Sequence, residues 1–358
     1  MWKYLLLAAC LHASNANGAE DPFAFDAADD GSASAWLPVL DLNLREDRVR
    51  DLPRPVDSDF NRWEARLFTG IEWRPSETLL ARATGRAFFA EQDNEQMAFN
   101  LDNERLDERA IDELFIDVQT GSLGLRAGQS ALPLTLSPML WDHDLRWRGL
   151  QLRARHEGLA RSFGVTAAGG RIDHGFGSDA EIAIVQGQWR SHYASGATEF
   201  ALAAIVFGEL DTLPETFRTN RRELLGTGLA TEFRLADLQV TQTFGTGRSA
   251  WQVGIDIARN LEAETSGDTG RFELRYGNAR NAGGFEIGAA LQRIQADAVP
   301  AAFNDDDWWF PTRMRGHALW VARGFDSGWQ LRAAAFREKR DGMGEYMQRV
   351  LVDLSYHY

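Results

Sequence analysis

Arginine and carboxylate side chains recur at every second residue in several stretches of this sequence. Rings of such charges select ions when they line a water-filled channel, and they pair with one another when they fill a narrow, closed interior. Both interpretations are open at this point. The residues of this kind, which we predict to line the inside of the molecule, are Arg62, Glu64, Arg66, Arg82, Arg86, Glu113, Asp117, Arg126, Arg153, Arg155, Asp256, Arg271, Glu273, Arg275, Glu286 and Arg332.

Catalytic chemistry has little support among the remaining polar residues. No His-x-x-x-His or Gly-x-Ser-x-Gly motif occurs, so the usual zinc-protease and serine-hydrolase patterns are absent from the sequence. His143 lies between Asp142 and Asp144, which could orient its imidazole, but a hydrolase would also need a nucleophile beside such a base. We therefore predict no enzymatic activity, no catalytic residue and no cofactor.

An acidic triplet, Asp305–Asp307, is followed directly by Trp308, Trp309 and Phe310. Carboxylate oxygens suit calcium, but the triplet lacks the 1-3-5 ligand spacing and the glycine of an EF-hand loop. We predict a solvated loop tip and no metal. The three aromatic residues are interpreted as loop packing or an interface girdle, in preference to a sugar platform.

The elements that must position these charges are β-strands, because the apolar residues alternate with the polar ones. In 61–74, NRWEARLFTGIEWR, one face carries the tryptophans and aliphatic residues and the other carries the charges. Trp63 and Trp73 are ten residues apart on the apolar face, roughly 25 Å along the normal of a tilted strand. That is the height of the apolar band between the aromatic girdles of a membrane barrel. The predicted lipid-facing girdle residues are Trp63, Trp73, Trp251, Tyr276, Tyr356 and Tyr358.

The alternation continues to the end of the sequence and predicts an all-β, transmembrane antiparallel β-barrel. Single-chain bacterial barrels have an even number of strands, so one of seventeen candidates is in error. Counting inward from both ends places the error between residues 209 and 250. We predict 16 strands, with 18 as the second choice. The candidates are 36–45, 61–74, 79–89, 113–119, 123–129, 146–155, 161–171, 182–190, 197–207, 225–234, 238–244, 251–258, 271–277, 285–292, 314–323, 329–336 and 348–358.

The connections differ in length. Short turns are predicted at 74–77, 119–122, 156–160 and 325–328, and long charged loops at 46–59, 92–108 and 297–312. Outer-membrane barrels have short periplasmic turns and longer external loops, so we place the long loops outside.

The N-terminus predicts export. Residues 1–19 read as a signal peptide with Lys3, a short apolar run and a small-residue region that could be cut after Ala16 or Ala19. Cys10 also fits a lipoprotein cleavage box, although it lies close to Met1. Residues 20–358 are predicted to form one barrel domain. Cys10 is the only cysteine, so disulfides and cysteine zinc sites are excluded, and the net charge of −14 argues against nucleic-acid binding.

Three segments resemble a family of bacterial outer-membrane porins. Residues 113–153 contain a strand hairpin ending in Leu-x-x-Gly-Gln and a Trp-Asp-x-Asp-Leu-Arg strand start. Residues 287–319 contain an Ala-Asp-Ala-Val loop followed by Phe-x-Asp-Asp, and 348–358 is an alternating strand that ends in an aromatic residue. Together they cover about a third of the chain. Trp308–Phe310 replace the glycine-rich stretch that usually follows the acidic triplet. The first segment also resembles alginate-export barrels, whose lumen is arginine-rich.

The resemblance implies passive transport across a bacterial outer membrane. We expect a porin for small hydrophilic solutes, with a channel for an anionic sugar or polysaccharide as the alternative and a closed structural or adhesive barrel as a third possibility. The implied partners are outer-membrane lipid, small solutes and the barrel-assembly machinery, which would bind the C-terminal strand Val350–Tyr358. A homotrimer is possible by analogy with other porins.

Overall fold

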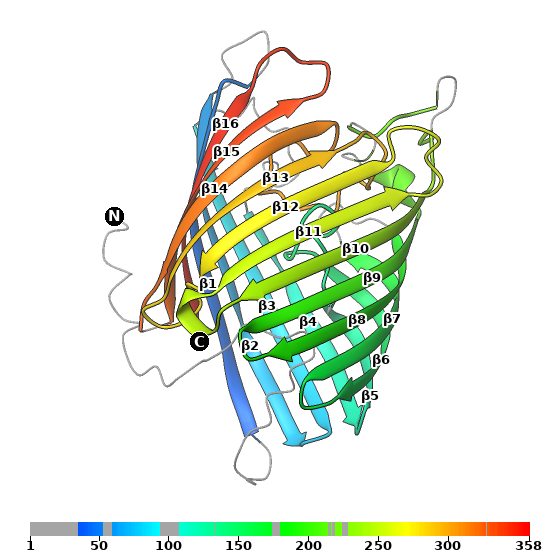
Figure 1. Cartoon of the computed structure of the whole chain (residues 1–358), viewed down its shortest axis with the longest axis vertical. Coiled ribbons are helices and arrows are strands. Elements are labelled where there is room, and N and C mark those ends of the chain that lie inside the picture. The colour runs from blue at the N-terminus through cyan, green and yellow to red at the C-terminus, as the bar shows by residue number, and fades with distance from the viewer. Residues whose placement is uncertain are drawn as a thin grey trace.

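The computed structural model describes residues 35–358 except 53–58, 94–106, 133, 174–179, 214–215, 217–218, 224–227 and 327. These residues form one closed antiparallel barrel in which each strand pairs with its neighbours in sequence and β1 pairs with β16 (Figure 1). The strands are β1 (Ala35–Arg50), β2 (Phe60–Ser76), β3 (Leu79–Gln92), β4 (Asp107–Thr120), β5 (Leu123–Ala131), β6 (Arg146–Glu157), β7 (Arg161–Asp173), β8 (Glu181–Tyr193), β9 (Gly196–Gly208), β10 (Phe233–Phe244), β11 (Trp251–Asn260), β12 (Asp268–Gly277), β13 (Phe285–Ile294), β14 (Met314–Gly324), β15 (Trp329–Arg340) and β16 (Met347–His357).

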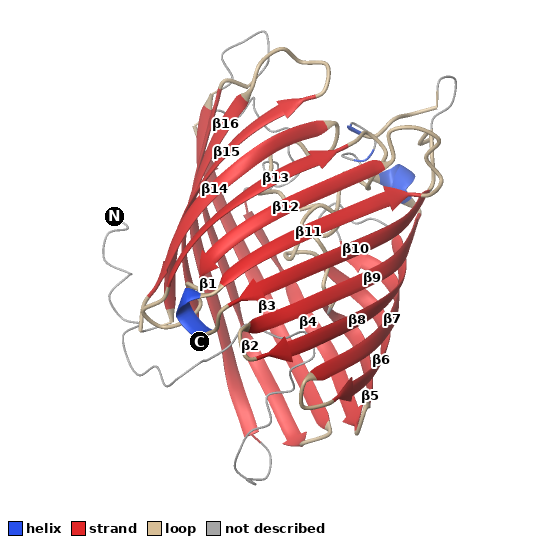
Figure 2. Ribbon diagram, in the orientation of Figure 1, coloured by secondary structure: helices blue, strands red, loops and turns tan. Residues whose placement is uncertain are grey.

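The predicted fold class is confirmed, including the count of 16 strands. Helix is limited in the described residues to short pieces such as η2 (Leu210–Thr212) and η3 (Gly247–Ser249), as Figure 2 shows. No helix in these ranges is long and apolar enough to cross a membrane.

One strand prediction was wrong, and it lies where the parity argument placed the error. The candidate at 225–234 overlaps the connection between β9 and β10, and β10 begins only at Phe233. Within the described residues 228–232 there is no strand. Leu229 alone forms an isolated bridge, with Arg222. The alternation that begins with Thr231 and Phe233 belongs to the start of β10, so a single strand replaces the two candidates at 225–234 and 238–244.

The alternation in sequence becomes an inner and an outer face. On β2, Trp63 is 57% exposed on the outside, whereas its neighbours Arg62 and Glu64 are buried inside. Leu150 and Leu152 on β6 are likewise exposed outward on either side of buried Gln151. An apolar outer face and a polar inner face are the arrangement of a barrel surrounded by lipid.

The two ends of the barrel differ. At one end, here the turn end, β2 runs into β3, β4 into β5 and β6 into β7 through tight turns, and β1 begins and β16 ends. At the other, the loop end, the connections include the segments 132–145, 209–232 and 295–313. The first and last of these segments, together with Arg221 and its neighbours, make most of the contacts described below.

Outward aromatic pairs gather at the turn end. Trp36 stacks on Trp73 with ring centroids 5.5 Å apart, and the centroids of Trp251 and Tyr276 are 4.8 Å apart. The remaining pairs of this kind are Trp189 with Phe200, and Trp329 with Tyr356. These rings form a belt at one border of the apolar band.

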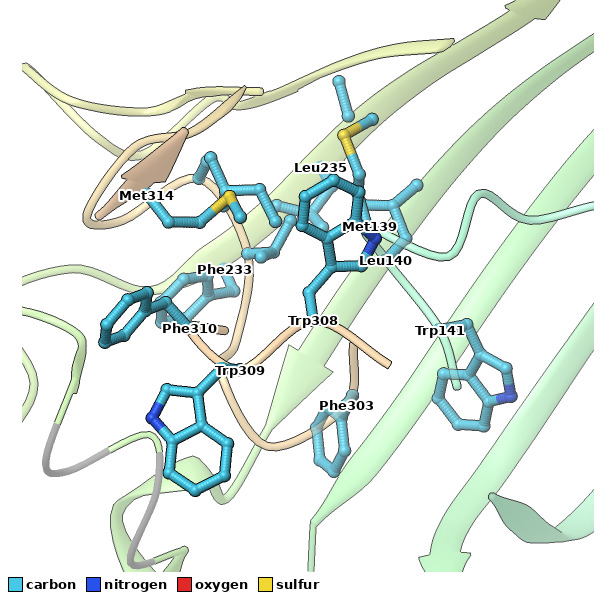
Figure 3. Packing of buried hydrophobic residues seen from close by; sticks show 14 of the residues in the cluster. Met139, Leu140, Trp141, Phe233, Leu235, Phe303, Trp308, Trp309, Phe310 and Met314 are labelled. Atoms are coloured by element: carbon cyan, nitrogen blue, oxygen red, sulfur yellow. The ribbon is translucent and has the colours of Figure 1, made fainter. Parts of the chain in front are cut away.

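The largest apolar cluster lies inside the barrel, towards the loop end. Strand residues such as Phe233 and Leu235 of β10 point inward and pack with Met139, Trp141 and Phe303, which belong to loops (Figure 3). A barrel of 16 strands is too wide for its own side chains to fill, so the loop residues complete this core.

Candidate functional site

The lumen holds all sixteen residues that were predicted to line it. Their strands place them in phase with buried inner residues and out of phase with exposed Leu, Ile and Phe side chains. Several keep access to water within the lumen, with exposed side-chain fractions of 35% for Arg275, 29% for Arg332 and 23% for Arg82. The structure thus places these groups together on one surface. That they line a solute path stays a prediction.

The inner charges are paired along the wall. Between β3 and β4 the guanidinium of Arg82 is 3.1 Å from Glu113. On β5 and β6, Arg126 and Arg153 both contact the buried carboxylate of Asp117, at 2.8 Å and 2.5 Å. Opposite charges on adjacent strands stabilise each other and cancel most of their field at long range. The pairing favours a lumen with alternating charges over one with a single strong sign.

A β-bulge on β4 adds a second acid to one position. Thr84 pairs with Glu113 while the next residue of β3, Gly85, pairs with Ile111, so Asp112 is the extra residue. Ile111 points outward, and both Asp112 and Glu113 are buried inside. A bulge re-aims a side chain in this way. Asp112 binds the guanidinium of Arg146 at 2.9 Å, where β6 begins.

The loop between β5 and β6, residues 132–145, runs along the inner wall. The backbone N–H of Thr135 donates to Gln186 Oε1 at 3.0 Å, and Gln239 Nε2 donates to the Thr135 carbonyl at 3.2 Å. Further along the loop, Ser137 Oγ donates to Asp256 at 3.3 Å. These contacts carry the loop from β5 past β8 and β10 to β11. The loop therefore narrows the lumen.

The same loop then returns across the lumen to the opposite wall. Thr269 Oγ1 on β12 donates to the sulfur of Met139 at 3.0 Å. Asp144 forms an ion pair with Arg66 on β2. The loop rejoins the barrel at Arg146. We name this loop, residues 132–145, the inner loop.

The loop between β13 and β14 also lies inside, and the prediction of an external, solvated tip at 297–312 was wrong. Asp307 is 2.8 Å from Arg45 on β1 and 3.0 Å from Arg332 on β15. Arg349 on β16 donates to the backbone carbonyls of Asp306 and Asp307. Buried guanidinium groups require anionic partners, and this acidic triplet supplies them. We name residues 295–313 the acidic loop.

Trp308, Trp309 and Phe310 are buried inside the barrel, which agrees with the predicted loop packing and not with a lipid girdle (Figure 3). Trp309 lies 5.3 Å from Phe60, measured between ring centroids. The backbone N–H groups of Trp309 and Phe310 donate to the carboxylate of Glu338 on β15, at 3.0 Å and 3.2 Å. The aromatic residues therefore fix the acidic loop against β1–β2 and β15.

The acidic loop is also held from the connection between β9 and β10. Asn220 Nδ2 donates to the carbonyls of Ala296 and Val299 at 2.7 Å and 2.9 Å, and its Oδ1 accepts from the N–H of Ala301 at 3.0 Å. Arg221 forms an ion pair with the buried carboxylate of Asp297. Two separate connections thus pack together inside the barrel.

The inner loop and the acidic loop meet in the lumen. The N–H of Asp142 donates to the carbonyl of Phe303 at 2.6 Å, and the N–H of Asp305 donates to the carbonyl of Pro138 at 2.8 Å. The rings of Trp141 and Phe303 are 6.0 Å apart. We name this meeting point the loop crossing.

Carboxyl groups crowd the loop crossing and titrate differently. Burial, followed by the negative charge of Asp306, raises the pKa of Asp142 to about 8. Burial and the charge of Asp307 raise the pKa of Asp305 to about 7. Burial would also raise the pKa of Asp307, but Arg45 and Arg332 hold it well below its usual range. Neutral and ionised carboxyl groups therefore coexist here near pH 7.

His143 lies at this crossing with an exposed side chain. Its ring nitrogens are 3.4 Å from Asp142 and 3.2 Å from Asp144. A carboxylate that could orient the imidazole is therefore present, as a hydrolase would need. Both ring nitrogens face carboxylates, however, and no described Ser hydroxyl forms a hydrogen bond with the ring. His317, the other candidate base, is exposed on the outer face of β14. The absence of enzymatic activity stays a prediction.

Two triads could supply oxygen and nitrogen ligands to a metal: Asp142–Asp144 and Asp305–Asp307. Arg45, Arg66 and Arg332 already neutralise Asp144, Asp306 and Asp307 through ion pairs. Guanidinium groups therefore occupy the oxygens that a cation would take. The prediction of no metal site is left as it stands.

Below the inner loop, towards the turn end, a pocket that is open to solvent lies between the loop and the wall formed by β6–β10. Its polar lining contains one ion pair, Arg190 with Glu199 at 2.9 Å. The other polar lining residues are Thr135, Arg155, Ser162, Gln188, Gln239 and Thr241. Amides, hydroxyls and paired charges suit hydrated, weakly charged solutes.

The predicted girdle residues all lie on the outer face, but at different ends. Trp73, Trp251, Tyr276 and Tyr356 belong to the aromatic belt of the turn end. Tyr358, 55% exposed, follows β16 at that end. Trp63 is at the loop end of β2. Contact with lipid is a prediction for all six.

Sequence reasoning missed Arg45, Asp47, Arg349 and Asp353, which complete the buried ion pairs around the acidic loop. Arg45 Nε donates to Asp353 at 2.7 Å, and Arg349 binds Asp47 with two hydrogen bonds of 3.0 Å and 2.7 Å. Arg45 is the last residue of the predicted strand 36–45, and Asp47 lies in the part of β1 that was predicted to be loop. Their alternation with Leu44 and Glu46 was the available signal.

Comparison with known proteins supports the fold. The sequence matches no protein-family model and no curated protein. Among solved structures, OprB of Pseudomonas putida aligns with a TM-score of 0.61 at 11% identity, covering 90% of this chain and 94% of that one. A triple mutant of the Rhodopseudomonas blastica porin aligns with a TM-score of 0.50 at 9% identity, covering 90% and 100%. The porin-type barrel implied by the sequence resemblance is thus confirmed as a fold.

Proposed function

We propose that this protein is an outer-membrane porin through which small hydrophilic solutes diffuse passively. The observation that carries the proposal is a closed 16-strand barrel with an apolar outer face and an inner wall of water-accessible, paired charges. Barrels of 16–18 strands leave an aqueous lumen. The structural likeness to the R. blastica porin agrees with this function.

The proposal includes the place and partners of the protein. Residues 1–19, which include Cys10, lie outside the described residues. In this proposal they direct export, and residues 20–358 form the mature barrel. Outer-membrane lipid would cover the outer face. The assembly machinery would bind Val350–Tyr358, which is the strand that closes the barrel against β1. A homotrimer is part of the proposal by analogy alone.

The experiment is single-channel recording of the refolded mature chain in a planar bilayer under a salt gradient. Steps of uniform size are expected, with a small reversal potential, because the wall charges cancel in pairs. A folded barrel that never conducts would overturn the porin and leave the closed structural or adhesive barrel.

A channel for an anionic sugar or polysaccharide is the second candidate. Arg126, Arg153 and Arg155 lie on adjacent strands near the turn end, where Arg126 and Arg153 share the carboxylate of Asp117 and Arg155 pairs with Glu157. This local excess of positive charge would favour anions. A strong anion preference in the same recordings, together with block by an acidic oligosaccharide, would select this candidate over the general porin.

A further inference from the structure

A row of basic side chains crosses the outer face of β13, β14 and β15 at the loop end. Arg293 is directly opposite Arg315 in the β13–β14 register, and Arg315 is directly opposite Lys339 in the β14–β15 register. These three strands are adjacent in the barrel (Figure 1). Facing residues on neighbouring strands have Cβ atoms about 5 Å apart.

A second row lies one outward position closer to the middle of the barrel. His317 is opposite Arg337 in the β14–β15 register. Arg337 and Lys339 also lie over the ring of Tyr346, at 4.6 Å and 5.3 Å from its centroid. We name Arg293, Arg315, His317, Arg337 and Lys339 the basic patch.

Among the described residues, no acidic side chain pairs with the arginines and lysine of the basic patch. In the part of the chain that the structure describes, no carboxylate lies within 4.0 Å of the charged groups of Arg293, Arg315, Arg337 or Lys339. The nearby acids Asp341 and Glu345 sit in the exposed turn after β15. Like charges directly opposite each other destabilise a sheet, so this arrangement calls for an external anion.

Two outward arginines elsewhere at the loop end have acidic partners. Arg259 on β11 pairs with Asp268 on β12 at 2.9 Å, and Arg234 on β10 pairs with Glu232 and Glu262. The absence of such partners among the described residues distinguishes the basic patch from these two positions. It supplies a matched control, because Arg259 has the same orientation and end of the barrel but a neutralised charge.

The patch lies at the border of the apolar band. Leu291, 58% exposed, is the next outward residue after Arg293, and Leu319, 61% exposed, is four residues from Arg315. At about 3.3 Å per residue along tilted strands, the charges lie roughly 5–10 Å from these leucines along the barrel axis. This is the level of lipid headgroups, which arginine and lysine reach with their flexible stems.

We propose that the basic patch binds the phosphate groups of a multiply phosphorylated lipid in the leaflet around the loop end. This rests on the proposed function, because it requires the barrel to lie in an outer membrane. Arginine forks bind phosphate oxygens in pairs, and facing cations about 5 Å apart can share one phosphate. The leucines below the patch contact the acyl chains of the same lipid.

The test measures binding of diphosphoryl lipid A to the refolded mature chain in uncharged maltoside micelles, by native mass spectrometry. The variant is Arg293→Gln with Arg315→Gln, and the control is Arg259→Gln. Each charge lost near a membrane surface lowers binding roughly fivefold, so the double variant is expected to bind about 25-fold more weakly. The control is expected to bind like the wild type.

Three comparisons decide the outcome. Equal binding by the double variant, or equal binding of dephosphorylated lipid A by the wild type, would overturn the proposal. If inorganic pyrophosphate competed for the basic patch as effectively as the lipid does, the patch would be assigned to free phosphate instead. Should the double variant misfold, judged by heat-modifiable gel mobility, Arg315→Gln alone is measured and a fivefold loss is expected.

Channel recording of the same samples separates this proposal from the porin function. A variant that conducts like the wild type but loses the lipid supports both. A wild-type chain that binds the lipid but never conducts would refute the porin and keep the lipid site.

Discussion

Arg349 illustrates how strongly the buried charges of the lumen depend on their partners. Its guanidinium and the Asp47 carboxylate are both nearly inaccessible to water and share two hydrogen bonds. Removing one member of such a pair leaves an uncompensated charge, which costs about 3–5 kcal/mol. We expect Arg349→Met to lower the free energy of unfolding by that amount, measured by urea titration in detergent with tryptophan fluorescence.

The control is the double variant Arg349→Met, Asp47→Leu. Replacing both charges with apolar groups removes the unpaired carboxylate, so most of the lost stability is expected to return. A double variant as unstable as the single one would show that Arg349 acts through its contacts with the acidic loop instead.

Asp142 and Asp305 predict a pH-dependent ion preference. Their pKa values are raised to about 8 and about 7. An acid is neutral below its pKa and anionic above it, so both become charged as the pH rises from 6 to 9. The reversal potential is expected to shift towards cation preference over this range. The shift should vanish in the variant Asp142→Asn, Asp305→Asn, and its persistence there would assign the effect to other groups.

At the residue scale, the sequence predicts which face of the barrel a side chain occupies better than it predicts which residue that side chain contacts. A period of two is a local property, so Arg62 and Trp63 could be assigned to opposite sides from their neighbours alone. Partners depend on which strands and loops meet. The contact of Arg45 with Asp307 joins residues separated by almost the whole barrel domain, and no local pattern indicates it.

The bulge at Asp112 makes a prediction at the scale of one strand. Ile111 faces outward and Glu113 faces inward although they are two residues apart. Deleting Asp112 therefore keeps every other residue of β4 on its present face. Deleting Ile116 instead would send the residues on one side of the gap to the wrong face. We expect the first deletion to give a folded, heat-modifiable barrel and the second to give none.

The sequence predicted which segments are strands better than it predicted where they end, because β1 (Ala35–Arg50) and β4 (Asp107–Thr120) extend beyond the predicted 36–45 and 113–119. The weaker Ala- and Gly-rich candidates, such as 161–171 and 197–207, are strands β7 and β9. The candidate at 225–234 was wrong because the alternation of apolar residues at its end belongs to β10, which begins at Phe233. Parity of the strand count detected this error when periodicity could not.

For the whole molecule, the inner loop sets the width of the lumen. Its hydrogen bonds to β8, β10 and β11 hold it against the wall. Replacing residues 136–143 with a short Gly-Ser link is expected to raise single-channel conductance about twofold or more, since an aqueous lumen of 16 strands is wide when empty. Replacing residues 342–345 of the turn after β15 with Asn-Gly keeps Asp341, whose N–H donates to the carbonyl of Arg313 in the acidic loop, and should leave conductance unchanged.

The inward folding of the two loops was the main feature that sequence reasoning missed at this scale. Loop length and charge led to an external placement of 297–312. The composition held a contrary signal, because Met139–Trp141 and Trp308–Phe310 would expose large apolar surfaces to water outside the barrel. Inward apolar residues on the strands, such as Ile205 and Leu235, are the matching surface.

The seam between β1 and β16 has a consequence for biogenesis. Its register runs from Asp41 opposite His357 to Arg50 opposite Gln348, so β1 finds its second partner only after β2–β15 have been synthesised. No N-terminal portion can close by itself, and any shortened chain keeps two unpaired edges that invite aggregation. β16 must therefore be synthesised and exported before the barrel can close, and the earlier strands must be kept from aggregating until then.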